Sequence, residues 1–252
     1  MTVTATVITV GFVFVAMLTS FWLRLKLERD LLIGTIRATI QLIAVGYVLE
    51  FVFSSHSSIF IVLMLFIMVF VASRNSAQRG KGVPNIFWRI FITNSCVTAF
   101  TLGLMLILHL VKAEPQAIIP IGGMIIGSSM VVCSLLLNQM KQRTESMEQE
   151  ILVALSLGAT AKQASERMNI ESIRAGMIPT IDSLKTVGLV QLPGMMTGLI
   201  IGGVSPVTAV RYQLLIMFSF TAAGALTSIM LGFLVYPTLF TRAHQFIGWP
   251  QK

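Results

Sequence analysis

The stretch IFITNSCVTAFTLGLMLILHLV, residues 90–111, holds no Asp, Glu, Lys or Arg over 22 positions. A helix needs about 20 apolar residues to cross the hydrocarbon core of a bilayer, because each residue adds about 1.5 Å to a thickness of about 30 Å. This stretch therefore predicts a membrane-spanning helix.

Six further apolar runs lie on either side of it, over residues 4–23, 33–53, 58–73, 118–138, 186–204 and 212–236. Hydrophobic residues make up 55% of the chain and charged residues 11%. A soluble domain carries roughly a quarter charged residues to keep its surface wet, so much of this surface must face lipid. The sequence predicts an all-α polytopic membrane protein with about seven transmembrane helices, in a single domain over 1–252.

The basic residues predict the orientation, because Lys and Arg concentrate in cytoplasmic loops. With the N-terminus outside and the C-terminus inside, 15 of the 18 basic residues fall inside, which predicts a multi-pass inner-membrane protein. Lys112 and Arg211 fall outside and Arg37 lies within a span. The net charge of +8 follows this loop pattern and forms no nucleic-acid face. The inner residues are Arg24, Lys26, Arg29, Arg74, Arg79, Lys81, Arg89, Lys141, Arg143, Lys162, Arg167, Arg174, Lys185, Arg242 and Lys252.

The longest polar segment, residues 139–185, reads as helical rather than as a slack linker. Met147, Ile151 and Leu155 share one helix face at i, i+4, i+8 spacing. Gly158 suits the left-handed position that ends a helix. Thr160 and Gln163 predict a capping box that starts a second helix, which Pro179 is expected to end. The segment is predicted to be a cytoplasmic helix–corner–helix.

No nucleotide site is recognisable. Arg79-Gly80-Lys81-Gly82 resembles the end of a P-loop, but Asn75 stands where an earlier Gly is needed and Gly82 where a Ser or Thr is needed. No catalytic arrangement appears either, so the chain is not expected to be an enzyme. Any ATP would be bound by another chain, and no cofactor is expected on this one.

Small residues recur at four-residue spacing, a pattern that lets helix backbones approach closely in lipid. The pattern leaves two alternatives open: packing within one subunit, or a subunit interface or moving seam. The residues are Gly123, Gly127, Gly194, Gly198 and Gly202.

Polar or helix-breaking residues inside spans are candidates for a translocation path. Pro193 lies near the middle of the predicted span over 186–204, with Gln191 and Met195 beside it, and broken helices often line such paths; a purely structural kink is the alternative. Arg37 and Gln41 share one face of the second span, where Arg37 either snorkels to the interface or faces a polar cavity. The 15 methionines are interpreted as core filler, and no metal site is proposed.

Several stretches carry a family resemblance. LSLGATAKQA from residue 155 and IRAGMIPTIDSLKTVGLVQLPGMMTGLI from residue 173 resemble the FetB-type permease family of ABC transporters, as do TIRATIQLIAVGYVLEFVF at 35–53 and IIPIGGMIIGSSM at 118–130. That family includes bacterial iron exporters and plant aluminium-tolerance permeases.

The resemblance implies a partner and an assembly. A separate cytoplasmic ATPase would dock on the polar segment and use the ATP, and two permease copies would form the pore. The residues expected to couple to the ATPase are Glu150, Leu155, Gly158, Ala159, Thr160 and Lys162.

The predicted function is therefore the permease subunit of an ABC transporter that exports a metal ion such as iron. An ATP-independent channel or secondary carrier is the alternative, and a membrane scaffold is a third hypothesis.

Overall fold

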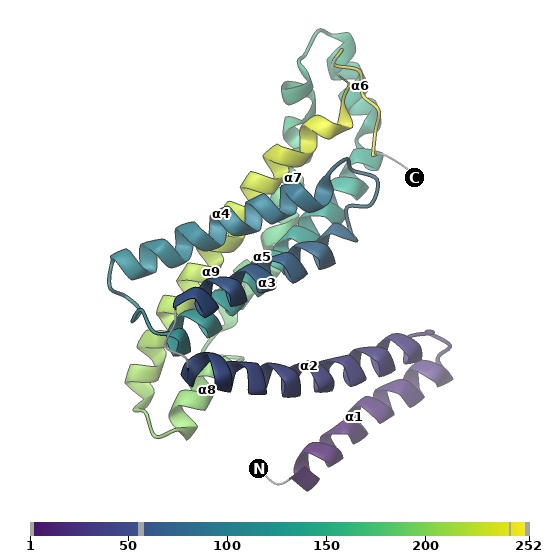
Figure 1. Cartoon of the computed structure of the whole chain (residues 1–252). Coiled ribbons are helices and arrows are strands. Elements are labelled where there is room, and N and C mark those ends of the chain that lie inside the picture. The colour runs from purple at the N-terminus through teal and green to yellow at the C-terminus, as the bar shows by residue number, and fades with distance from the viewer. Residues whose placement is uncertain (1–2, 55–57, 242, 250–252) are drawn as a thin grey trace. The chain divides into compact units, whose positions relative to one another are not determined.

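The computed structural model describes residues 3–54, 58–241 and 243–249 (Figure 1). Arg242 and Lys252, counted above with the inner tail, lie outside these residues. The described residues form helices and contain no β-strand beyond two isolated bridges. They divide into two compact units, residues 1–57 and 58–252, which are described separately.

The first unit is a pair of helices, α1 (Val3–Trp22) and α2 (Glu28–Ser54). Their connection is held by the buried Ser20 hydroxyl, which donates to Glu28 Oε1 at 2.9 Å and accepts the N–H of Leu27 at 3.2 Å. The side chains of α2 remain largely exposed and apolar. Such a helix pair needs an apolar surrounding on almost every side.

The second unit is a bundle of five long helices. These are α3 (Ser58–Ala77), α4 (Ile86–Ile107), α5 (Pro115–Ser146), α7 (Ala161–Thr186) and α9 (Pro206–Val235). Successive long helices run in opposite directions, and α5, α7 and α9 pack against one another.

The short elements of this unit lie at its two ends (Figure 1). One end, called here the α6 end, carries α6 (Glu148–Ser156), the 3₁₀ helix Tyr236–Leu239 and the connection between α3 and α4. The opposite end, called the α8 end, carries α8 (Gly194–Ile201) and the connection between α4 and α5.

The distribution of polar side chains is inverted relative to a soluble protein. Ser73, Asn94, Ser129 and Thr227 are fully buried, whereas large apolar side chains lie on the surface. Exposed apolar surface on this scale marks contact with something apolar. Within the described residues, five helices are long and apolar enough to cross a membrane: 28–54, 59–77, 86–107, 115–146 and 206–239. The chain is an all-α, multi-pass membrane protein, as predicted.

The buried polar groups join the helices. Asn94 on α4 donates to Ser73 on α3 at 3.2 Å, and Thr227 on α9 donates to Ser129 on α5 at 3.1 Å. Ser76 also donates to the Met130 carbonyl at 2.9 Å. Interhelical hydrogen bonds of this kind contribute about 0.6 kcal/mol each in lipid, where apolar burial supplies little.

The predicted single helix over 186–204 is wrong. Helix α7 ends at Thr186, residues 187–193 form a non-helical break, and α8 is only eight residues long. Gly188 turns the chain with a positive φ of 83°, and its N–H donates to the Gln191 carbonyl at 2.9 Å. Pro193 is consequently the N-cap of α8 and not a kink within a span.

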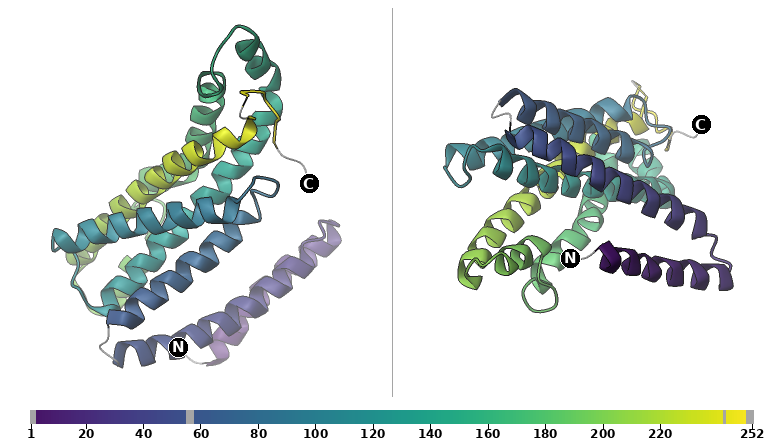
Figure 2. Two further views of the ribbon diagram at one scale, coloured as in Figure 1. Left: turned by 45° about the horizontal axis from the view of Figure 1, so that its top comes forward. Right: turned by 60° about the horizontal axis from the view of Figure 1, so that its bottom comes forward.

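Three smaller expectations also need correction. Pro179 lies inside α7 and does not end it, since α7 continues for another two turns packed between α5 and α9. Lys185 lies in the last turn of α7, at the α8 end, and not beside the polar segment's corner. Tryptophan rings favour the membrane interface, which predicts Trp249 there, but Trp249 is buried. Its indole donates to the Lys81 carbonyl at 3.3 Å, which brings the C-terminal segment onto the α3–α4 connection (Figure 2).

Candidate functional sites: an exposed corner and a broken crossing

The first candidate site is the turn between α6 and α7, residues 157–160, called here the corner. Gly158 has φ of 89°, the left-handed conformation predicted for it, which a side chain with a Cβ adopts with strain. The predicted capping box is confirmed: Thr160 Oγ1 accepts the Gln163 N–H at 3.4 Å, and Gln163 Oε1 accepts the Thr160 N–H at 2.9 Å. Local chemistry therefore fixes the start of α7.

The corner is mounted rigidly on the bundle. Met147 and Ile151 are buried in one apolar cluster and Leu155 packs against it, so the predicted α6 face is confirmed. The same cluster contains Leu137 of α5 and Leu239 of the 3₁₀ helix. A displacement of α6 must therefore move the end of the bundle, because close-packed interiors transmit strain.

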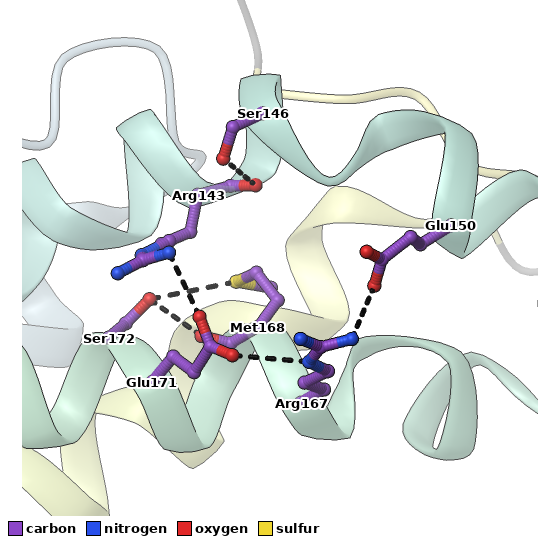
Figure 3. A network of polar contacts seen from close by, with 7 residues as sticks. All are labelled: Arg143, Ser146, Glu150, Arg167, Met168, Glu171 and Ser172. Carbon is purple, nitrogen blue, oxygen red and sulfur yellow. Dashed lines mark hydrogen bonds and ion pairs between the residues drawn. The ribbon is translucent and has the colours of Figure 1, made fainter.

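A chain of charges adds a second connection among α5, α6 and α7 (Figure 3). Arg143 of α5 lies 2.9 Å from Glu171 of α7, and Glu171 also accepts from Arg167 at 3.1 Å. Arg167 in turn donates to Glu150 of α6 at 3.2 Å. Three helices are thus cross-linked by four side chains, of which sequence reasoning identified only Glu150.

The tip of the corner is apolar and exposed. Leu157 is 82% exposed, and Leu152 and Val153 on α6 are exposed beside it. Among the residues predicted to couple, Gly158 and Thr160 form this corner together with the half-buried Ala159, and Lys162 is exposed one turn into α7. An ordered, exposed apolar tip on a polar element is typical of a protein-binding surface; Leu157 was missed because one Leu in a polar segment carries no periodic signal.

The second candidate site is a hollow of about 410 Å³ at the break between α7 and α8. The structure brings together here three residues that the sequence predicted for the path: Gln191, Pro193 and Met195. Helices α5, α7 and α9 supply the other walls. The lining residues are Met124, Ser128, Val131, Pro179, Thr180, Ser183, Gln191, Pro193, Gly194, Met195, Gln213, Met217 and Phe220.

Gln213 is the residue of this hollow that sequence reasoning missed. It is 7% exposed, and its side-chain oxygen has no hydrogen-bond partner among the described residues. An unpaired buried amide costs about 1–3 kcal/mol. The sequence feature that could have identified Gln213 is its amide side chain at the start of the apolar run 212–236, one helical turn from Met217.

The remaining predicted residues are two polar side chains of the first unit and glycines of α5 and α8 in the second. Arg37 and Gln41 lie one turn apart on α2, both exposed, in the first unit. A Cβ added at Gly127, Gly194 or Gly198 would meet nothing within 4 Å in the part of the chain that the structure describes. Contact of these glycines with a second subunit stays a prediction.

Two further glycines of the predicted pattern make weak contacts only. A Cβ at Gly123 would reach the Met68 side chain at 3.7 Å, and one at Gly202 would meet only the carbonyls of its own turn, from 3.3 Å.

Among residues 3–54, 58–241 and 243–249, no group of three or more His, Cys, Asp or Glu is placed to hold a metal ion.

The apolar bundle with its buried polar contacts defines a multi-pass membrane protein, and α7 and α8 are separated by a non-helical break. Residues 3–240 match the uncharacterised protein family UPF0014, and the chain belongs to that family.

Its relatives carry transport and membrane names. The chain is 44% identical to "UPF0014 membrane protein YjkA" of Bacillus subtilis, over 94% of this chain and 95% of the relative. It is 42% identical to "Probable iron export permease protein FetB" of Escherichia coli, over 93% and 91% of the two chains. It is 34% identical to "Protein ALUMINUM SENSITIVE 3" of Arabidopsis thaliana, over 92% and 85%. The resemblance to FetB-type permeases is confirmed, and no solved structure matches the chain.

Proposed function

We propose that this chain is the permease subunit of an ABC transporter and that a separate cytoplasmic ATPase docks on the corner. Two copies form the pore in the inner membrane. Each copy crosses the bilayer seven times with the N-terminus outside and the C-terminus inside. The sixth crossing consists of the second half of α7, the break and α8.

The observation that supports this proposal most strongly is that one helix joins the two candidate sites. Helix α7 begins at the corner and ends at the break, and its 26 residues make it about 39 Å long. Pro179, Thr180 and Ser183 near its far end line the hollow. A push on the corner therefore reaches the hollow through one hydrogen-bonded element.

The cargo proposed is a metal ion such as iron, on the strength of the Escherichia coli relative's name. The ATP is used by the partner and not by this chain. The ATPase then transmits the energy of ATP hydrolysis to the permease by contact with the corner. The exposed apolar tip of the corner, fixed on the packed helices α5, α6 and α7, suits that role.

The test is the substitution Leu157→Asp at the corner tip. Leu157 is 82% exposed, so the change should leave the fold intact while a charge replaces the apolar contact. The variant should lose at least tenfold in co-purification of the partner ATPase and in ATP-driven transport. Leu110→Asp is the matched control: it introduces the same charge at an exposed leucine of the α8 end and should retain the ATPase.

If Leu157→Asp binds the ATPase and transports like the original chain, the docking assignment is wrong. If cargo crosses vesicle membranes without any ATPase, the chain is a channel or secondary carrier.

A further inference from the structure

The hollow at the break is rich in hydrogen-bond donors that nothing in the described chain uses. The first four N–H groups of a helix, counted from the N-cap, have no partner within it, and the N-cap of α8 is Pro193, which has no N–H and leaves three. At α8 these belong to Gly194, Met195 and Met196, and in the described residues no acceptor meets them; the first N–H to find one is that of Thr197, which donates to the Pro193 carbonyl at 3.1 Å.

Two hydroxyls of the hollow are also free. Ser and Thr in helices commonly donate back to the carbonyl four residues earlier, and Ser183 does so to Pro179 at 2.8 Å. Ser128 of α5 and Thr180 of α7 line the same hollow, and the structure gives their hydroxyls no such bond. They are available to a bound molecule.

Gln213 is the observation that points to a ligand independently of the α8 terminus. Its side chain is more than nine-tenths buried, lines the hollow from α9, and its oxygen has no partner in the described residues. The two ends of an amide are interchangeable in position, so this group can present its NH₂ to an acceptor in the hollow.

The polar groups that line the hollow favour an anionic ligand over a bare cation. No Asp, Glu, Lys, Arg or His is among its lining residues. Helix N-termini carry a partial positive charge of roughly half an elementary charge and bind anions through their N–H groups. A bare hard cation needs carboxylate, carbonyl or water oxygens, whereas this hollow offers mainly N–H and O–H donors.

We propose that the hollow binds an anionic group of the cargo, a carboxylate or a phosphate, held by the α8 N–H groups and the Gln213 amide. This inference rests on the proposed transport function and deepens it. A metal cargo then crosses as a complex with an anionic ligand and not as the bare ion.

The experiment is equilibrium binding to the purified full chain in lipid nanodiscs, without any ATPase. The probes are radiolabelled citrate, radiolabelled inorganic phosphate and Fe²⁺ alone, at fixed ionic strength. At least one anion should bind saturably, and Gln213→Leu should weaken it at least tenfold. Gln142→Leu is the control: it makes the same change at an exposed glutamine of α5, at the α6 end and away from the hollow, and binding should stay within twofold.

The variant Ser128→Ala/Thr180→Val keeps the side-chain volumes near the original and should weaken the same anion, which covers the case in which Gln213→Leu does not fold. Citrate binding alone assigns a carboxylate, phosphate binding alone a phosphate, and binding of both an oxyanion of either kind. The inference is overturned if neither anion binds, if both sets of variants bind like the original, or if Fe²⁺ alone binds the hollow in a Met217-dependent way. If the original chain binds the anion but shows no ATP-driven transport with its ATPase, the proposed function is overturned and the anion site stands.

Discussion

At Gly176 two helix backbones come into contact. A Cβ built there would lie 3.3 Å from the backbone nitrogen of Leu136 on α5, an atom that cannot move aside as a side chain can. The absence of a side chain at this position sets the distance between α7 and α5. The proposed mechanical coupling between the corner and the hollow through α7 depends on that distance.

Gly176→Leu should therefore destabilise the bundle. Overpacking costs about 1–3 kcal/mol, and here the strain falls on backbone, so a value at the upper end is expected. The measurement is the thermal unfolding midpoint in detergent. Gly127→Leu introduces the same side chain where nothing lies within 4 Å and should shift the midpoint much less; equal shifts would show that α5 and α7 are not in close contact.

Sequence spacing indicated that glycines mattered but selected the wrong ones for contacts within the chain. The tight approaches between helices use Gly122, Gly176 and Gly232, whose added Cβ atoms would meet Leu65, Leu136 and Asn169. None of these three belongs to the predicted GxxxG steps. A spacing pattern defines a helix face, whereas the contact depends on which neighbour lies against that face.

At the scale of elements, α7 joins two environments in one helix. Its first half carries the charges of the network, and its second half packs against α5 and α9. The predicted corner was correct because capping and the left-handed glycine are local chemistry. The far end was misplaced because apolar counting assigned one continuous helix to residues 186–204, whereas α7 ends at Thr186 and a non-helical break follows it.

The charge network should stabilise this element more than an isolated pair does. Glu171 contacts both Arg143 and Arg167, so Glu171→Gln removes two ion pairs at once and leaves Arg167 paired with Glu150 only. Exposed pairs contribute about 0.2–1 kcal/mol each, and a loss of about 1 kcal/mol in the free energy of unfolding is expected.

The control for that change is Asp182→Asn, which breaks the single exposed pair to Lys185 at 3.5 Å. Its effect should stay within about 0.5 kcal/mol. Denaturant unfolding of both variants in detergent, at low and high salt, measures the difference. An Asp182→Asn effect as large as that of Glu171→Gln would mean that the network adds nothing beyond its separate pairs.

At the scale of the whole molecule, the all-helical, lipid-facing architecture was predictable, because composition and run length depend on the solvent and not on contacts. The hollow was only half predictable. The sequence indicated an irregular segment at Gln191 and Pro193. The hollow is also lined by residues of other helices, namely Gln213, Ser128 and Thr180, and the spacing within one segment does not predict contacts between helices.

Orientation can be tested with exposed positions at the two ends of the second unit. Most basic residues of this unit lie toward the α6 end, so that end is expected in the cytoplasm. A membrane-impermeant thiol reagent added outside intact cells should label Lys112→Cys and spare Gln142→Cys, both in a background with Cys96 and Cys133 replaced by alanine. The reverse labelling would invert the topology; Ser55, another external candidate, lies outside the described residues.

The contact between Trp249 and Lys81 spans 168 residues of sequence. A ribosome adding about 5–20 residues per second needs roughly ten to thirty seconds to make that much chain. During that interval the α3–α4 connection has emerged without the aromatic cover that it carries in the finished protein. Closure of this end thus has to wait until residue 249 has been made, and a protease that attacks nascent membrane proteins would find an accessible segment there.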